Sequence, residues 1–361
     1  MLKIMTVTGP IDPESLGVTS MHEHILMKGG VFRQSYLDEN PGITEPVRGD
    51  EKVTLENTGL IRRNNMLTWD AQDLVDEEAM GGEIQDFKDS GGNSIVELSV
   101  PGLRYDVAGL RRISEKTGVN VVAATGFYLQ MSWPKEYLSY EVEDFANTMC
   151  NEIRNGIEGT DIKPGVLKIG MFPLSVQEEK ALRAAVMVAQ ETGLSLTVHP
   201  SSGIGGDALV VVKLLKKWGM DLNRTVIAHM GGRFFPGDMR RNVLYPETWG
   251  LNVDLPKAVL DMGANISIEF LNQSDRELEG SVNPADWMKL AGLVELLRQG
   301  YGERIVLGTD LCAKPMARRF GGEGYCRLTS FALPALTGKM GVSPYAVRLM
   351  TEENPARILA Y

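Results

Sequence analysis

The histidines are the residues of this chain whose type and spacing most clearly suggest chemistry. The 361-residue sequence contains four of them, His22, His24, His199 and His229. Residues two apart in a strand point to the same side, so the imidazoles of His22 and His24 could reach one ion. His199 and His229 each end a short run that is rich in Val, Ile, Leu and Ala or Thr. A single histidine at the end of a strand is usually a hydrogen-bonded core or surface residue, but four in equivalent positions predict a metal site.

An aspartate and a lysine occupy similar positions. Asp310 comes directly after the run Ile305–Thr309; it could cap a turn or helix, but beside the histidines it is a candidate carboxylate ligand and proton acceptor. Lys168 lies inside the apolar run Val166–Gly170. It could extend its charge to solvent at the end of the strand, or it could be a neutral amine, because burial and nearby cations lower the pKa of lysine. A neutral amine can add CO2, and the resulting carbamate can bridge two cations.

These side chains need a scaffold that brings the ends of several strands together. Eight short β-rich runs alternate with longer amphipathic stretches, and several runs are apolar at consecutive positions, as in parallel strands buried on both faces. The predicted strands are Val18–Met21, Ser94–Leu98, Val119–Ala124, Val166–Gly170, Ser195–His199, Thr225–His229, Asn265–Phe270 and Arg304–Gly308. The predicted helices are Ala71–Ser90, Asp106–Thr117, Tyr140–Asn155, Ser175–Thr192, Asp207–Trp218, Leu255–Met262, Trp287–Gln299 and a helical region after Gly324.

Eight strand-then-helix units favour an α/β fold, a (β/α)8 TIM barrel, and we interpret residues 1–361 as one such domain. In this type of barrel the active site lies at the C-terminal ends of the strands. Two long connections, Lys28–Leu67 after the first predicted strand and Gly231–Gly250 after the sixth, should lie over this face. Loops of this length are usually functional or disordered.

Composition argues against several classes of protein. A formal net charge of -10 argues against a general surface for nucleic acid or anionic membranes and leaves a small molecule as the expected partner. No apolar run approaches the ~18 residues of a membrane span, and the N-terminus does not resemble a signal peptide. Three cysteines are few and odd in number, which suggests reduced thiols. We therefore expect a soluble cytoplasmic protein; a homodimer stays open, because nothing in the sequence locates an interface.

The chain resembles the phosphotriesterase-related branch of the amidohydrolase superfamily. The matching segments follow one another in the expected order across nearly the whole sequence. They are Gly17–His24, Val166–Gly170, Val198–His199, Ile227–His229, Gly308–Asp310 and Glu353–Arg357. The H-x-H pair alone would be weak evidence, whereas the ordered set of six candidate ligands is specific.

The resemblance implies a site that holds two divalent metal ions. It implies these ligands: His22, His24 and Asp310 for one ion, and His199 and His229 for the other. A carboxylated Lys168 and a hydroxide would bridge the two ions. Imidazole donors suit Zn, Mn, Co, Fe and Ni, of which we expect Zn.

Substrate contacts are less clearly marked. The resemblance implies a tyrosine at the mouth of the third strand that lines the pocket, here Tyr128, although its ring could equally be packed within a loop. Arg233 could meet an anionic substrate from the loop after the sixth strand, but such an arginine is more often a solvated surface charge. In lactonase-like relatives an arginine near the end of the seventh strand often contacts the substrate, and the nearest candidate in this chain is Arg276.

The resemblance therefore implies a metal-dependent hydrolase in which a bridging hydroxide attacks the substrate and Asp310 accepts the proton. Our first choice of substrate is a lactone or other carboxylic ester, with weak phosphotriesterase activity. An N-acyl amide is the alternative, since the same hydroxide can attack an amide carbonyl. A barrel that binds a ligand without turnover is a further alternative, against which the intact ligand set speaks.

Overall fold

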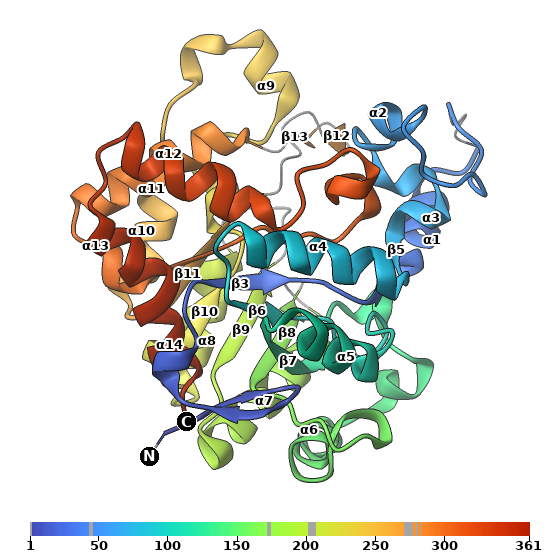
Figure 1. Cartoon of the computed structure of the whole chain (residues 1–361), viewed down its shortest axis with the longest axis vertical. Helices are drawn as coiled ribbons and strands as arrows, with labels where there is room; N and C mark the ends of the chain where they lie inside the picture. Colours follow the sequence, from blue (N-terminus) through green and yellow to red (C-terminus); the bar gives the residue numbers. More distant parts are fainter. Residues whose placement is uncertain are drawn as a thin grey trace.

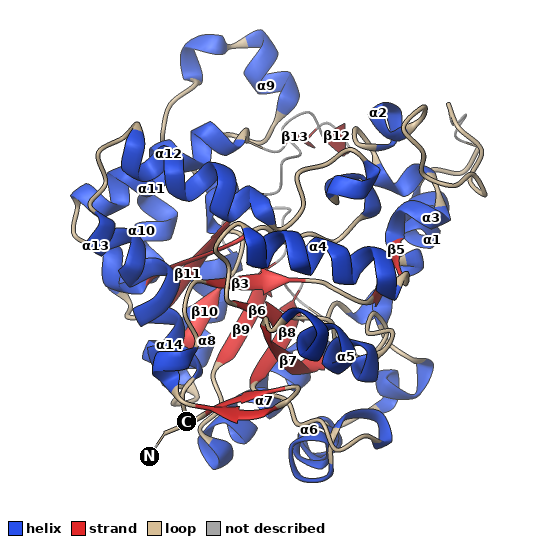
Figure 2. Ribbon diagram, viewed as in Figure 1, coloured by secondary structure: helices blue, strands red, loops and turns tan. Residues whose placement is uncertain are grey.

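The computed structural model describes residues 2–42, 46–171, 175–200, 207–270, 277–278, 281–282 and 284–361. Its centre is a sheet of eight parallel strands with helices packed around it (Figures 1 and 2). In spatial order the strands are β3 (Thr19–Glu23), β6 (Ser94–Glu97), β7 (Asn120–Phe127), β8 (Val166–Met171), β9 (Leu196–Pro200), β10 (Thr225–Ile227), β11 (Asn265–Glu269) and β14 (Ile305–Gly308). Each of the predicted runs overlaps one of these strands.

The sheet curls until its first and last strands meet. The backbone amide of Asp310, just after β14, donates a hydrogen bond to the carbonyl oxygen of His22 on β3. Gly308 permits this close approach, because a Cβ atom at that position would lie 3.0 Å from the backbone nitrogen and oxygen of His22. The arrangement confirms the predicted (β/α)8 TIM barrel.

Helices surround the barrel largely as predicted. They are α4 (Glu77–Asp89), α5 (Val107–Thr117), α6 (Val142–Asn155), α7 (Val176–Thr192), α8 (Asp207–Lys217), α10 (Asp254–Asp261), α11 (Asp286–Arg298), α12 (Leu333–Gly338), α13 (Pro344–Arg348) and α14 (Asn354–Leu359). Gly118 and Gly193 end α5 and α7 in the left-handed conformation, with φ of 68° and 78°. This conformation strains residues with a side chain, which is why glycine commonly ends helices.

The prediction of one helix over Ala71–Ser90 is wrong at its N-terminal part. The structure has a short helix α3 (Trp69–Gln72), then a strand β5 (Asp73–Leu74), and only then α4. β5 pairs with β4 (Met27–Lys28), so a tertiary contact overrides the local helical pattern. Asp76 is the residue before α4, and its side chain caps the helix by accepting a hydrogen bond from the amide of Ala79.

The two long connections contain secondary structure of their own. Residues 28–67 include α1 (Gly30–Glu39) and α2 (Thr58–Ile61), and residues 231–250 include α9 (Met239–Leu244). In Figure 1, α2 and α9 lie on the side of the barrel away from the two chain termini. Because the connections leave the ends of β3 and β10, they lie at the C-terminal face, as predicted.

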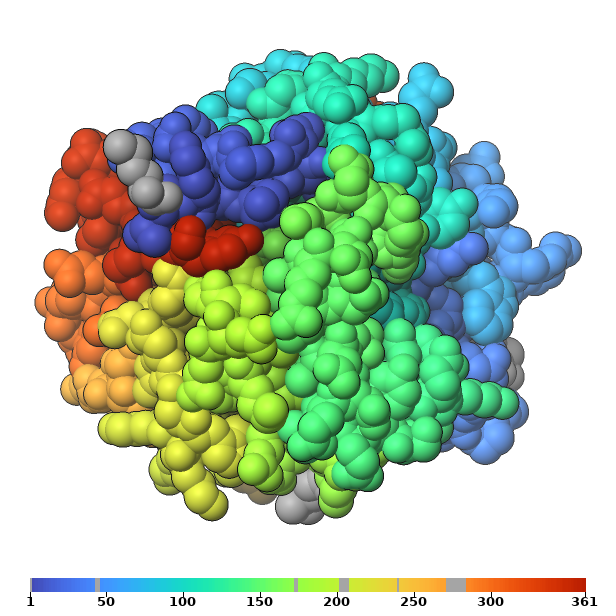
Figure 3. All heavy atoms as spheres, turned by 90° about the horizontal axis from the view of Figure 1, so that it is seen from below, coloured from blue at the N-terminus to red at the C-terminus, as the bar shows by residue number. Residues whose placement is uncertain are grey.

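The N-terminal residues lie at the other end of the barrel. β1 (Ile4–Thr6) and β2 (Gly9–Ile11) form a hairpin, and the amide of Val7, in the turn between them, donates to the carbonyl of Val121 near the start of β7. Figure 3, seen from below, shows this hairpin in blue beside the C-terminal residues in red. Among the residues that the structure describes, no helix combines the length and apolar character needed to span a bilayer.

Candidate metal centre

Three of the predicted ligands meet where β3 and β14 end. Asp310 Oδ1 lies 3.4 Å from His24 Nε2 and 3.6 Å from His22 Nε2. Both histidine side chains are buried. The backbone of Asp310 has a left-handed conformation with φ of 51°, which is uncommon for a residue other than glycine. The three donor atoms are close enough for one divalent ion to contact them all.

The other two histidines lie beside this group. His199 Nδ1 is 2.7 Å from His229 Nε2. The rings of His229 and His22 have centroids 4.8 Å apart, so the two groups adjoin. All four histidines of the chain therefore converge at one end of the barrel.

Lys168 is buried among these side chains. Its Nζ atom lies 3.3 Å from His22 Nε2, and none of the residue is exposed to solvent. Burial lowers the pKa of Lys168 to about 8, although the carboxylates of Asp310 and Glu269 act in the opposite direction. The lysine does not extend its charge to solvent, and a substantial neutral fraction exists at mildly basic pH.

Glu269, at the end of β11, is a residue that the sequence reasoning missed. Its Oε1 lies 3.1 Å from His22 Nδ1, and its Oε2 accepts a hydrogen bond of 3.0 Å from the backbone amide of His229. The hydroxyl of Ser267 also donates to this carboxylate. Glu269 thus fixes two histidines relative to each other. A signal was available, since an acidic residue inside an apolar strand needs polar partners to be buried.

His24 has its own supporting contacts. Its Nδ1 lies 2.8 Å from Ser99 Oγ, and that hydroxyl donates to Glu97 Oε1 at 2.6 Å. Because the serine proton points to Glu97, the serine oxygen is left to accept the Nδ1 proton of His24. His24 Nε2, which faces Asp310, is then the ring nitrogen available to a cation.

Glu23 lies between the two histidines of the H-x-H pair and holds the segment that carries Asp310. Its carboxylate accepts hydrogen bonds from the backbone amides of Thr309 and Leu311, at 2.7 and 3.0 Å. The Thr309 hydroxyl adds a third at 2.7 Å. Burial raises the pKa of Glu23 to about 7, against the effect of these hydrogen bonds.

The protonation states suit cation binding. Burial lowers the pKa of His22 to about 4 and that of His199 well below its ordinary value. Burial alone would raise the pKa of Asp310, but the neighbouring His22 and His24 hold it below its usual range. Neutral imidazoles and ionised carboxylates are the forms that bind metal, so the donor set fits divalent ions.

Tyr128, predicted to line the pocket, lies at this site. Its hydroxyl oxygen is 3.1 Å from His199 Nε2. Its ring packs edge-on against His199 and against Phe32 of α1, with centroids 4.9 and 5.9 Å apart. The first long connection therefore reaches the wall of the site.

Arg233 is half-buried at the end of a short 3-10 helix, Met230–Arg233, that follows His229 directly. This places it at the C-terminal face, next to the predicted ligands in the chain. Arg276, the other arginine considered for substrate binding, lies outside the described residues.

Two known proteins resemble this chain along nearly its whole length. The N-acetyltaurine hydrolase of Xenopus tropicalis is 30% identical over 363 residues, covering 99% of this chain and 98% of the relative. The N-acetyltaurine hydrolase of Rattus norvegicus is 28% identical with the same coverage of both chains. Both relatives match along essentially their whole length.

Solved structures show the same fold. A resiniferatoxin-binding protein from Rhodobacter sphaeroides superposes with a TM-score of 0.85 and 28% identity, covering 99% of this chain and 94% of that one. A lactonase from Listeria monocytogenes gives a TM-score of 0.75 at 22% identity, covering 99% and 98%. The model of the phosphotriesterase family matches residues 2–359. The chain therefore belongs to the phosphotriesterase family and is a hydrolase.

Proposed function

We propose that this hydrolase cleaves N-acyl amides with two divalent metal ions bound at the C-terminal face of the barrel. The observation that carries the proposal is the convergence of buried and half-buried imidazoles, a carboxylate and a buried lysine at one end of the barrel. The choice of an amide is supported by the relatives named N-acetyltaurine hydrolase, which this chain matches over 98% of their length.

The division of the residues between the two ions that we propose is the one that the sequence resemblance implies. The ligands would be His22, His24 and Asp310 for one ion, and His199 and His229 for the other. Lys168 would complete both sites as a carbamate, formed when its neutral amine adds CO2 and loses a proton. Its burial beside His22 supports this role. We expect zinc at these donors, and Mn, Co, Fe or Ni could use the same set.

When bound, the two cations supply a hydroxide nucleophile and polarise the scissile carbonyl group. Asp310, ionised at neutral pH, would accept the proton that the nucleophile releases and pass it to the departing amine. The Tyr128 hydroxyl, which lies beside His199, would hydrogen-bond the substrate. Arg233 would pair with an acidic group on the amine part of the substrate, such as a sulfonate or carboxylate.

The lactone or carboxylic ester prediction uses the same centre and stays a prediction, as does weak phosphotriesterase activity. An ester has a better leaving group than an amide, so the same nucleophile could cleave it. Binding without turnover is the remaining alternative, and a structural relative is described as a resiniferatoxin-binding protein.

A reconstituted enzyme and a substrate panel test the proposal. The metal-free protein is loaded with Zn, Mn or Co in the presence of bicarbonate and assayed with N-acetyltaurine, N-acetyl amino acids, neutral N-alkylacetamides, lactones, aryl esters and an aryl phosphotriester. We expect the highest kcat/KM for an anionic N-acyl amide, and Arg233→Ala should reduce its preference over the neutral amides. A higher kcat/KM for lactones would support the ester prediction instead, and no turnover with both metals bound would support a binding role.

A further inference from the structure

Lys289 is a buried cation that lies outside the set of predicted ligands. It is on α11, and its side chain is only 2% exposed. Burying an ammonium group is costly unless polar partners replace its water. The polar partners of Lys289 therefore indicate which part of the structure it stabilises.

The ammonium group of Lys289 reaches the end of a barrel strand. It donates a hydrogen bond of 2.7 Å to the backbone carbonyl oxygen of Glu269, the last residue of β11. Asp286 lies one helical turn before Lys289, and its Oδ1 is 3.2 Å from the ammonium nitrogen. The aspartate balances the charge, so the lysine can act as a fixed donor to this one carbonyl.

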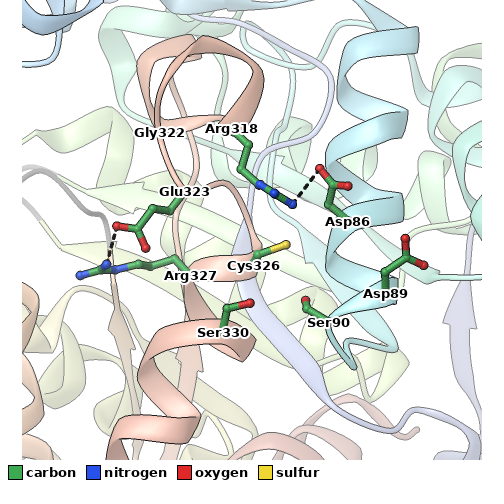
Figure 4. A pocket seen from close by; sticks show the side chains of 9 residues that line it. All are labelled: Asp86, Asp89, Ser90, Arg318, Gly322, Glu323, Cys326, Arg327 and Ser330. Carbon is green, nitrogen blue, oxygen red and sulfur yellow. Dashed lines mark hydrogen bonds and ion pairs between the residues drawn. The ribbon is translucent and has the colours of Figure 1, made fainter.

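The ion pair continues outward to the surface. Asp286 Oδ2 accepts a hydrogen bond of 2.9 Å from Arg327 Nε, and Arg327 pairs with Glu323 at 2.6 Å. Figure 4 shows Arg327 and Glu323 at the edge of a surface pocket of about 510 Å³. The guanidinium group also stacks on the ring of Phe331, 3.7 Å from its centroid. A continuous series of ion pairs thus runs from the buried Lys289 to Glu323 at the surface.

The stem of Lys289 also packs against the turn after β10. A Cβ atom at Gly231, two residues beyond His229, would lie 3.4 Å from the Cδ atom of Lys289 and 2.9 Å from Ile268. Glycine therefore leaves room for the lysine between the two strand ends. One side chain contacts both segments that carry Glu269 and His229.

We propose that Lys289 is a positioning residue that fixes the end of β11 and, through the Glu269 carboxylate, the orientation of His22 and His229. This inference rests on the proposed metal-dependent function. Glu269 reaches His22 Nδ1 at 3.1 Å and the His229 amide at 3.0 Å, so a shift of its backbone moves both histidines. Mutation of residues that orient metal ligands commonly lowers metal affinity by about 10–100-fold.

Lys289→Met keeps the length of the stem and removes the ammonium donor. Arg298→Met is the matched control, because Arg298 is on the same helix with its side chain 73% exposed. Each metal-free protein is titrated with Co2+ against a competing chelator, and the visible absorption of the bound Co2+ is recorded. We expect Lys289→Met to bind at least one ion about tenfold or more weakly, with an altered spectrum. Arg298→Met should match the wild type in both measurements.

The Co2+ affinity and spectrum, compared with the unfolding temperature, distinguish a role in positioning the histidines from a role in stabilising α11 alone. Unchanged Co2+ affinity and spectrum in folded Lys289→Met, even with a lower unfolding temperature, would overturn the inference. If that variant does not fold, Lys289→Arg replaces it, since arginine keeps a charge beside Asp286 but cannot place a single ammonium at the carbonyl. A wild type that binds no Co2+ would instead overturn the metal-dependent function itself, whereas binding without amide hydrolysis would leave the role of Lys289 intact.

Discussion

The backbone amide of Asp310 donates a hydrogen bond to the carbonyl oxygen of His22, with 2.9 Å between the two atoms. This bond joins the last strand of the barrel to the first and brings together side chains from the two ends of the sequence. Asp310 also has a φ of 51°, a conformation that costs an aspartate of the order of 1 kcal/mol. Closing the barrel and assembling the candidate metal centre are therefore one structural event.

Asp310→Asn should lower kcat by about 100-fold or more, because the amide cannot accept the proton that the reaction releases. Asparagine tolerates the left-handed conformation as well as aspartate does, so the unfolding temperature should change little. Both quantities are measured on the metal-loaded enzyme with its best substrate, together with metal content. Asp50→Asn is a control that removes an exposed carboxylate. A kcat within a few-fold of the wild type would show that Asp310 is not the proton acceptor.

Glu269→Gln should weaken metal binding by about 10–100-fold. The side chain keeps its shape, but a neutral amide oxygen polarises the ring of His22 less than a carboxylate does, and the 3.0 Å bond from the His229 amide loses its charged acceptor. Chelator competition with Zn2+ or Co2+ measures the change. A dissociation constant equal to that of the wild type would mean that Glu269 does not orient the histidines.

The convergence of the candidate metal donors was predictable because it follows from where these residues lie along the strands. His199 lies near the end of β9 and His229 follows β10, and parallel strands that end at one face bring such residues together. Glu269 was missed because its role depends on partners on β3 and β10, distant in sequence. Its position within an apolar strand is visible in the sequence.

The helix prediction over Ala71–Ser90 was wrong for a similar reason. Its residues have a helical pattern throughout, yet Asp73 and Leu74 pair with Met27 and Lys28 and leave the helix. Such a break is decided by a long-range backbone contact, about which local propensity carries no information. The functions of the long connections also depend on distant contacts, such as that of Phe32 with Tyr128.

Activation of the metal-free protein should depend on pH through Lys168. Burial lowers the pKa of this lysine from 10.5 to about 8, so about half of it is neutral at pH 8 and only a few per cent near pH 6.5. Only the neutral amine adds CO2. At constant dissolved CO2 and metal, the rate of reactivation should therefore rise from pH 6 and level off above pH 8. Lys168→Ala should not reactivate at any pH, and a wild-type rate that is independent of pH would contradict the carbamate.

Asp70 should stabilise the first long connection in a pH-dependent way. Its Oδ1 pairs with Lys314 at 2.7 Å and with Lys52 at 2.8 Å, and the side chains of Asp70 and Lys314 are 7% and 11% exposed. Burial alone would raise the pKa of Asp70, but the hydrogen bonds from the two lysines lower it below 3.8. Asp70→Asn removes the charge opposite a buried lysine, which should cost about 3 kcal/mol of unfolding free energy near pH 7.

The sign of the pH effect follows from the lowered pKa. A carboxyl group with a lower pKa in the folded state stabilises the fold fully above its unfolded pKa of about 3.9, and this contribution is lost as pH falls through the folded pKa. The difference between the wild type and Asp70→Asn should therefore be constant from pH 5 to 7 and shrink below about pH 4. Urea unfolding at each pH measures it, and Asp50→Asn, in an exposed pair with Arg48, should differ little from the wild type throughout. If the difference in unfolding free energy between the wild type and Asp70→Asn were unchanged at pH 3, packing would stabilise the contact between the first long connection and the loop after β14. The ion pair with Lys314 would then not be responsible.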